Sequence, residues 1–508
     1  MESWVAALPL ANVGETARRV FHALQAVQEE NISGAQLFRV LEQLRPVIAY
    51  LSDALARHYH DAPLPAPGKS RKAAAAAGAL YDAFAQAYER VFENIALQNR
   101  LAQDGDLYLA AVHRALSYRG EALLVACQRY EPPPPGSWLK INALYRMAEE
   151  RGMHAREVSS PLPRDGACTT VKDLYTRVVL LALAGPERLT QQELHDVYEL
   201  LAAWAPHCRL SRGGLAAAAD AMLSFERAMD APPAPIDPAS APNPEAVLHL
   251  DTRQLEPLLK RAMEHASATP RRPRGEPSAR RALGRHVLRG LHRAWRALDR
   301  RRFTRAAARA PVRAILGLSA CHKVFAGHNA PPARGSGQVF TAELDNESAS
   351  GARLRYGGEV AARVGDLLAV NISENGITHG IAVVRWLKCA DTDTVELGLQ
   401  WLAPRATALD IRRLGAPVKG EALHGLLLPP VQAAGIGASI LVPAYLFHPG
   451  EMLVLKSRRG EERVKLTRVV DATRAYTRFH YRSLDNEDEP GEPLSRSSPG
   501  HSSLWSGL

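Results

Sequence analysis

The chain has 508 residues, a formal net charge of +10 at pH 7, 46% hydrophobic residues and 23% charged residues. These proportions are typical of globular proteins of about three domains, and they exclude wholesale disorder, collagen and a coiled-coil rod. Five scattered cysteines without a Cys-x-x-Cys pair, no signal peptide and no apolar run near the ~20 residues that cross a bilayer predict a cytoplasmic protein without disulfides.

The sequence of residues 1–265 predicts a helical domain. Apolar residues such as Val20 and Leu24 recur at helical spacing, and Ala, Leu, Glu and Arg dominate the composition. Thr190 followed by Glu193 fits a helix N-cap with a capping box. Proline-rich breaks separate groups of helices, which favours an irregular bundle or a short solenoid. Helices are expected over 72–101, 107–130, 137–151, 170–183 and 190–204.

We expect residues 266–300 to form an arginine-rich linker, with a helix over 282–298. Fifteen arginines and no lysine lie between Pro270 and Arg313, together with only two acidic residues. This segment alone is more basic than the whole chain, so the positive charge is local. Guanidinium groups form a planar fork that matches a phosphate or a guanine edge. Three interpretations are open at this point: a solvated basic linker, a phosphate or nucleotide pocket, and a nucleic-acid-binding tail.

The C-terminal part of the chain predicts antiparallel β-structure. Its apolar runs are short and are separated by Gly, Asn and Asp, which favours a barrel or a sandwich over a parallel sheet. We expect a β-barrel over 301–410, a further small β module over 415–483 and a disordered tail over 484–508. The fold class is therefore α+β multidomain. Strands are expected over 339–344, 352–356, 367–371, 379–388, 395–401, 452–456, 462–470 and 474–481, the sixth and seventh of which form a hairpin.

Two short polar motifs fall within the first β region. Arg305 and Arg309 form an Arg-x-x-x-Arg motif at the entry to the barrel, on a segment that we expect to be flexible. Asn346, Ser348 and Gly351 form an Asn-x-Ser-x-x-Gly motif about 40 residues further on. Arginines bind phosphate groups bidentately, short amide and hydroxyl groups bind bases, and glycine permits close approach of the backbone.

In order and spacing, these motifs resemble the PilZ domain, the bacterial receptor module for cyclic di-GMP. The resemblance covers residues 301–405 and includes a Val364-Gly365-Asp366 turn and a strand that ends in Val384-Arg385-Trp386. It implies that Arg305 and Arg309 bind the phosphates and a guanine edge, with Arg301 and Arg302 as alternatives. It also implies that Asn346, Ser348 and Gly351 bind a base, and that the ligand is bound and not turned over, without a cofactor or a metal.

The leading hypothesis is a cytoplasmic cyclic di-GMP effector whose barrel is coupled to a helical domain that binds a protein partner. One alternative is a degenerate PilZ-like adaptor that binds a protein partner without nucleotide, and another is an Arg-rich nucleic-acid-binding protein. An enzyme is not expected, because no catalytic constellation is found. Cys321 and His322 are adjacent only in sequence, and a second Asn-x-Ser-x-x-Gly motif at 371–376 reads as an ordinary turn.

Overall fold

The contacts of the computed structural model divide the chain into two compact units. The helical unit comprises Met1–Ala62, Ala66–His265 and Val287–Arg300, and the barrel unit comprises Pro63–Pro65, Ala266–His286 and Arg301–Leu508. The structure describes residues 2–29, 32–159, 168–212, 222–266, 283–296, 304, 306–327, 339–358, 360–371, 379–391, 393–415, 422–430 and 437–485. Most of the arginine-rich linker and of the tail predicted over 484–508 therefore lies outside the described residues.

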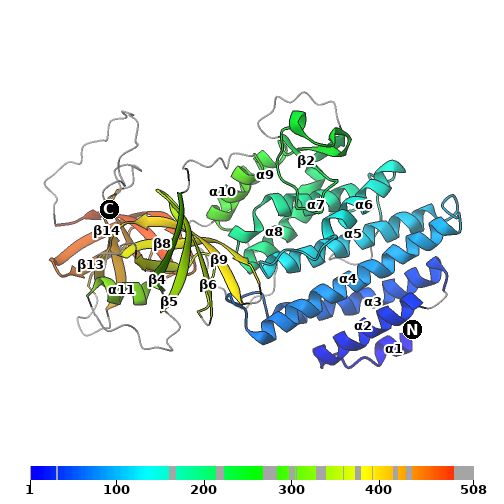
Figure 1. Ribbon diagram of the computed structural model, residues 1–508. Coiled ribbons are helices and arrows are strands. Elements are labelled where there is room, and N and C mark those ends of the chain that lie inside the picture. The colour runs from blue at the N-terminus through cyan, green and yellow to red at the C-terminus, as the bar shows by residue number, and fades with distance from the viewer. Residues whose placement is uncertain are drawn as a thin grey trace. The chain divides into compact units, whose positions relative to one another are not determined.

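The helices predicted for the N-terminal half are present, and α2 to α5 lie alongside one another in Figure 1. The predicted capping box begins α8: the Thr190 hydroxyl accepts a hydrogen bond from the Glu193 N–H, and the Glu193 carboxylate accepts one from the Thr190 N–H. Within the described ranges, no helix is both long and apolar enough to span a membrane. The helices are α1 Glu2–Ala6, α2 Val13–Glu29, α3 Gly34–Ala56, α4 Gly68–Leu97, α5 Gly105–Gln128, α6 Ser137–Glu150, α7 Val171–Leu183, α8 Gln191–Trp204, α9 Leu255–His265 and α10 Arg285–Ala294.

The helical unit also contains a small antiparallel sheet that the sequence did not predict. Its strands are β1 (Arg209–Arg212), β2 (Met222–Glu226) and β3 (Val247–Asp251), in the order β1-β3-β2. The central strand is buried at four of its five positions, so the sheet forms part of the packed interior. Each strand has only four or five residues, which is too short for a clear period-two pattern in the sequence.

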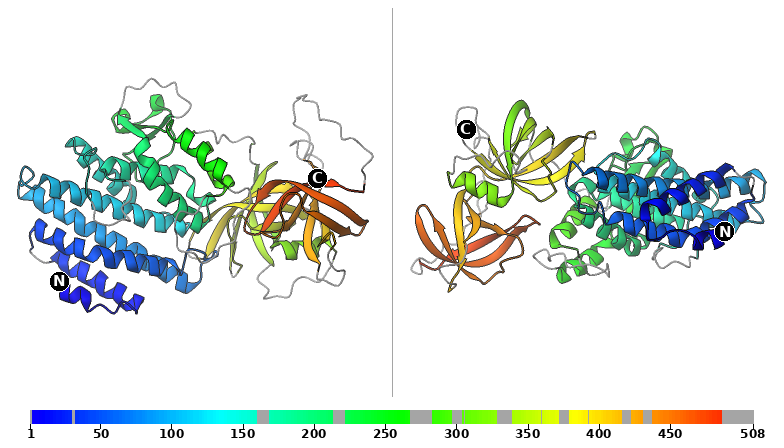
Figure 2. Two further views of the ribbon diagram at one scale, coloured as in Figure 1. Left: turned by 180° about the vertical axis from the view of Figure 1, so that it is seen from behind. Right: turned by 90° about the horizontal axis from the view of Figure 1, so that it is seen from below.

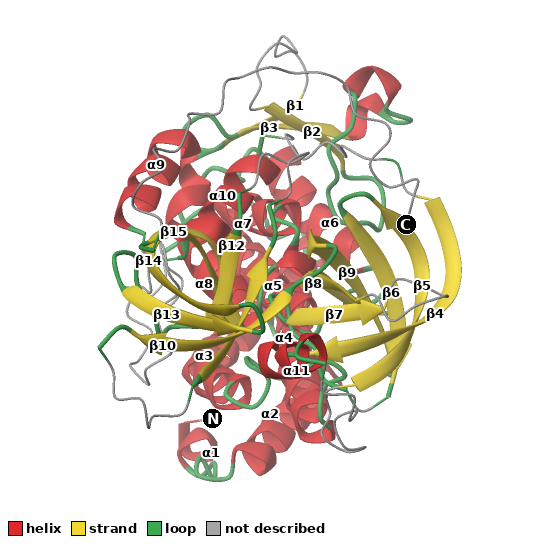
Figure 3. Cartoon of the chain, turned by 90° about the vertical axis from the view of Figure 1, so that its left-hand side faces the viewer, coloured by secondary structure: helices red, strands yellow, loops and turns green. Residues whose placement is uncertain are grey.

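The first barrel closes six antiparallel strands in the order β4-β5-β6-β9-β8-β7 (Figure 3). Apolar residues alternate toward the interior, where Leu354, Leu397 and Ile381 are fully buried. A short helix, α11 (Leu318–Phe325), joins β4 to the segment before β5. The strands are β4 Ala306–Leu316, β5 Val339–Ser348, β6 Gly351–Gly357, β7 Leu367–Asn371, β8 His379–Cys389 and β9 Thr394–Ala403.

The second barrel closes six further antiparallel strands in the order β10-β11-β12-β15-β14-β13. The predicted hairpin is present, with Ser457 of β13 paired to Gly460 of β14. Together, the helical half and the two barrels confirm the α+β multidomain prediction. The strands are β10 Thr407–Arg413, β11 Leu423–Leu428, β12 Ser439–Pro443, β13 Met452–Ser457, β14 Gly460–Ala472 and β15 Tyr476–Ser483.

The two barrels of the barrel unit, shown from two further sides in Figure 2, share one apolar core. Ile381 of β8 belongs to the same buried cluster as Leu426 of β11 and Tyr476 of β15. An ion pair adds to this interface, because Arg385 of β8 lies 2.7 Å from Asp471 of β14. The second barrel is thus continuous with the first in its packing.

Candidate ligand-binding face of the first barrel

The β5–β6 hairpin presents the predicted Asn-x-Ser-x-x-Gly motif. Asn346 and Ser348 lie in β5 and Gly351 begins β6, with Asn346 opposite Arg353 and Ser348 opposite Gly351. Residues two apart in a strand point to the same side of the sheet, so Asn346 and Ser348 share one side of β5. A register irregularity at Asp345 places this side outward, away from the buried Leu354. The motif therefore occupies the outer face of the barrel.

The hairpin turn is fixed by its own hydrogen bonds. The Ser348 hydroxyl donates to the Gly351 carbonyl oxygen at 3.1 Å, and the Trp401 backbone N–H of β9 donates to the Ser350 carbonyl oxygen at 3.1 Å. Gly351 has a steric role as well, because a Cβ at this position would lie 2.0 Å from the Leu399 carbonyl oxygen. Packing of β6 on β9 thus explains the glycine without any ligand.

Asn346 has a buried polar atom that the protein itself leaves unpaired. Its Oδ1 atom is buried and has no hydrogen-bond partner among the described residues. A buried acceptor without a partner is uncommon, because it loses its hydrogen bond to water without a replacement. An acceptor of this kind pairs with N–H donors such as those on the Watson–Crick edge of guanine. This atom makes Asn346 the residue of the motif that best fits a ligand contact.

Arg309 lies on the same outward side as this hairpin. It belongs to β4, where Ala307 and Arg309 are exposed while Ala308 is half-buried, and Ala307 pairs with Asn346. The ladder skips from Ala307 to Ala310, so Arg309 lies at a bulge beside the motif. No described carboxylate forms an ion pair with Arg309.

The position of Arg309 corrects one expectation. The sequence predicted a flexible segment around the two arginines, whereas β4 begins at Ala306 and is paired with β5 on both sides of the bulge. The backbone of Arg309 is therefore part of a strand of the barrel itself. Arg305, its predicted partner, and the alternatives Arg301 and Arg302 lie outside the described residues.

A group of charged residues on the same face was not predicted from the sequence. Asp345 lies 3.3 Å from Arg353 and 2.9 Å from Arg355, and Glu396 of β9 lies 2.6 Å from Arg353. The hydrogen bond to Asp345 raises the pKa of Arg355, so this side chain stays charged. The signal was available in the alternation Arg353-x-Arg355 directly after Gly351, which puts both arginines on one side of β6. Arg353 lies opposite Asn346, so this ion-paired group adjoins the motif.

Two other sequence features concern Cys321 and the second Asn-x-Ser-x-x-Gly motif. Burial raises the pKa of the Cys321 thiol to about 12, and its Sγ atom lies 3.5 Å from the Ile315 carbonyl oxygen, so it is not an activated nucleophile. Asn371 ends β7, and the rest of the second Asn-x-Ser-x-x-Gly motif lies outside the described residues.

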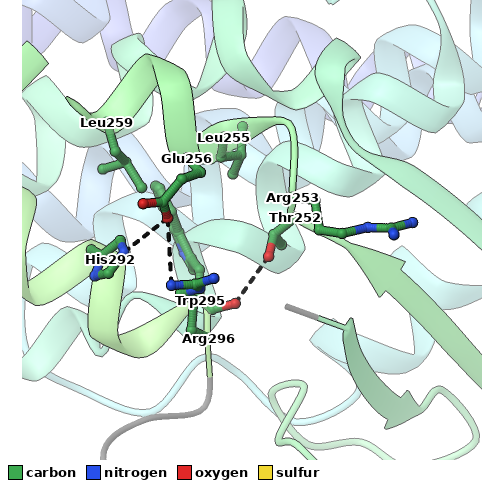
Figure 4. Close-up of a pocket in the computed structure, with 8 residues that line it drawn as sticks. All are labelled: Thr252, Arg253, Leu255, Glu256, Leu259, His292, Trp295 and Arg296. Atoms are coloured by element: carbon green, nitrogen blue, oxygen red, sulfur yellow. Dashed lines mark hydrogen bonds and ion pairs between the residues drawn. The ribbon is translucent and has the colours of Figure 1, made fainter. Parts of the chain in front are cut away.

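A pocket of about 180 Å³ lies between α9 and α10 in the helical unit (Figure 4). The Glu256 carboxylate contacts His292 at 2.9 Å and Arg296 at 3.7 Å, and the Thr252 hydroxyl donates to the Trp295 carbonyl oxygen at 3.0 Å. The volume is below the ~300 Å³ at which pockets for small-molecule ligands begin. We therefore interpret these contacts as packing that holds α10 against α9.

Comparison with known families assigns the chain. Three family models match successive parts of it: "Cyclic-di-GMP receptor FimW, N-terminal domain" over residues 1–217, "Cyclic-di-GMP receptor FimW, middle PilZ domain" over residues 222–332, and "FimW C-terminal beta-barrel domain" over residues 411–484. The chain therefore belongs to the PilZ-domain family of cyclic-di-GMP receptors, as the resemblance indicated.

A curated relative matches the chain over nearly all of its length. The relative is the cyclic-di-GMP receptor FimW of Pseudomonas aeruginosa. It is 23% identical to this chain in an alignment that covers 99% of this chain and 95% of the relative. No solved structure matches the chain. The match to the middle PilZ model ends at residue 332, so the β5–β6 hairpin lies between the second and third matched segments.

Proposed function

We propose that this protein is a cytoplasmic cyclic di-GMP effector that binds its ligand on the outer face of the first barrel. The proposal rests mainly on one observation: Arg309 and the motif of Asn346, Ser348 and Gly351 lie side by side on adjacent strands, and the Asn346 Oδ1 atom has no partner among the described residues. Membership of a receptor family supports it, as does the similarity to the cyclic-di-GMP receptor of Pseudomonas aeruginosa.

The chemistry of the face matches the ligand in two ways. Guanidinium groups of Arg309 and Arg305 bind phosphate oxygens or the O6 and N7 acceptors of guanine. The Asn346 amide accepts from guanine N–H groups, while the Ser348 hydroxyl, which donates to Gly351, retains lone pairs that accept. Binding of this kind breaks no bond in the ligand and requires no cofactor, so the protein acts by binding and not by catalysis.

Strand β6 offers a route from this face to the helical half of the chain. Gly351 begins the strand, and near its other end the Tyr356 hydroxyl donates to the Leu64 carbonyl oxygen at 3.0 Å. Leu64 and Ala362 exchange two backbone hydrogen bonds, at 3.0 and 2.8 Å. The segment Pro63–Pro65 belongs to the barrel unit by its contacts, yet it connects α3 to α4 along the chain. A ligand that shifts β6 thereby acts on the α3–α4 connection, and we propose that the helical unit passes this change to a protein partner.

Calorimetric titration with cyclic di-GMP tests the proposal. We expect wild-type protein to bind with a dissociation constant well below roughly 100 μM, and Arg309→Ala and Asn346→Ala each to weaken binding by about tenfold or more. Arg468→Ala is the matched control, because Arg468 is an exposed strand arginine of the second barrel. Thermal melts of each variant separate loss of binding from loss of folding.

Three results lead away from the proposal. Folded wild-type protein that gives no heat of binding at about 100 μM ligand excludes a receptor of physiological affinity and leaves an adaptor with a structural barrel. Equal affinity of wild type and both variants places the ligand elsewhere on the chain. Binding to duplex DNA that weakens steeply with salt identifies the arginine-rich segment as a nucleic-acid site instead.

A further inference from the structure

Helix α11 brings a histidine of the first barrel against the second barrel. It packs against β10 and β11 as well as β4 and β7, and it lies between the two barrels in Figure 3. His322 on this helix is only 7% exposed. Asp410 of β10 and His424 of β11 are directly opposite each other in the ladder of the second barrel. Three potential metal ligands from three different elements therefore meet at this interface.

The three side chains are close to one another. His322 Nε2 lies 3.4 Å from Asp410 Oδ1, and the rings of His322 and His424 stack with centroids 4.1 Å apart. Because an imidazole binds an ion in its ring plane, the partly exposed His424 ring has to turn out of this stack to share an ion with His322. One nitrogen of each histidine and one oxygen of Asp410 all lie within 4.8 Å of one another. We propose that His322, Asp410 and His424 form a binding site for a divalent transition metal, with zinc as the ion that this donor set suits best.

The donor chemistry supports zinc over other ions. Zinc is commonly held by imidazole nitrogens and carboxylate oxygens at about 2.0–2.2 Å, in sites that keep a fourth position for water. Calcium and magnesium prefer all-oxygen ligands, so two imidazoles disfavour them. Tetrahedral ligands at these bond lengths are about 3.4 Å apart. Ligand atoms that lie within 4.8 Å of one another therefore have to approach by up to about 1.4 Å, and rotation of the partly exposed Asp410 and His424 side chains provides this movement.

Ser319 completes the arrangement from the first turn of α11. Its hydroxyl oxygen lies 3.2 Å from His424 Nδ1, which is the contact that a metal-binding histidine makes through its second nitrogen. When the serine oxygen accepts from a protonated Nδ1, Nε2 is the nitrogen with a lone pair for the ion. A bound ion links α11 of the first barrel to β10 and β11 of the second, and so stabilises the barrel–barrel interface.

Zinc binding to the full-length protein tests the site. Protein stripped with a chelator and titrated with Zn²⁺ alone is expected to bind one ion per chain with a dissociation constant tighter than about 100 μM, and to melt at a higher temperature with zinc than without it. Co²⁺ is expected to give the visible absorption of a tetrahedral site. His424→Gln and Asp410→Asn are expected to abolish one-to-one binding, and Ser319→Ala to weaken it about tenfold.

His448→Gln is the matched control, because His448 is an exposed histidine that also lies 3.3 Å from a carboxylate, that of Glu451. It is expected to bind zinc as wild type does. Partly exposed His424 and Asp410 are chosen over buried His322 so that the variants remain folded. Absence of one-to-one binding by wild type, or binding by His424→Gln and Asp410→Asn equal to wild type, overturns the proposal.

Discussion

Gly351→Ala is expected to destabilise the barrel unit because of a single close approach. The added Cβ lies 2.0 Å from the Leu399 carbonyl oxygen and 3.2 Å from its carbonyl carbon, whereas real Cβ atoms essentially never come within 3.0 Å of another heavy atom. The end of β6 must therefore move away from β9 by at least about 1 Å. Overpacking of this kind costs about 1–3 kcal/mol, and a lost ladder hydrogen bond adds about 1 kcal/mol.

We expect a total loss of about 3 kcal/mol from the free energy of unfolding. For a unit of this size, the loss corresponds to a fall of roughly 6–12 °C in melting temperature, measurable by scanning calorimetry of the full chain. Gly437→Ala is the control in the same unit, because the nearest atom to its added Cβ is 3.6 Å away, which is ordinary contact. A Gly351→Ala variant that melts within about 2 °C of wild type refutes the steric argument.

The same substitution also bears on ligand binding. A shift of β6 moves Gly351 away from Ser348, whose hydroxyl donates to its carbonyl oxygen, and so deforms the hairpin that carries Asn346. We therefore expect weaker cyclic di-GMP binding even though glycine has no side chain to contact the ligand. A variant that loses stability and keeps full affinity places the ligand away from this hairpin.

Three further predictions concern stability. Burial raises the pKa of Asp366 from 3.8 to about 6, so its ionisation costs the folded protein up to about 3 kcal/mol as pH rises from 4 to 7. Asp366→Asn is therefore expected to raise the free energy of unfolding by up to that amount at pH 7 and to leave it unchanged at pH 4. Urea unfolding at both pH values measures the difference. A double-mutant cycle of Arg385→Gln and Asp471→Asn is expected to give a coupling free energy of only about 1 kcal/mol, because Arg385 is 38% exposed and water screens the ion pair. This coupling is expected to disappear as pH falls through the lowered pKa of Asp471, where the carboxylate is protonated. Trp295→Ala is expected to cost about 3–5 kcal/mol in a thermal or urea melt, because the indole is 1% exposed and donates to the Leu180 carbonyl oxygen at 3.1 Å.

Local patterns carried most of the fold prediction. The strand predicted over 367–371 is present with the same bounds, and the helix predicted over 137–151 ends one residue earlier. The Thr190 capping box and the β13–β14 hairpin were also predictable, because both depend on residues within a few positions of one another. The sheet of β1, β2 and β3 was missed since β1 pairs with a strand more than 30 residues away and nothing near Arg209 indicates it.

In the candidate site, too, local features could be predicted and features that depend on distant strands could not. The Asn346 motif could be predicted because its residues are close in sequence and its turn is local. The strand position of Arg309 could not, since the alanine-rich run 306–310 has weak strand propensity and is extended only by pairing with β5. The ion pairs among Asp345, Arg353 and Glu396 depend on the register of three strands, which a single sequence does not give.

The shared core of the two barrels decides how ligand binding can act on the chain. Leu367 and Val383 of the first barrel are buried in one cluster with Leu428 and Leu441 of the second, so separating the barrels would expose all of them to water. Since each buried leucine or valine contributes about 1.5–3 kcal/mol, a ligand worth about 8 kcal/mol at micromolar affinity cannot separate them without losing most of its binding energy. We therefore expect the two barrels to respond to the ligand as one body.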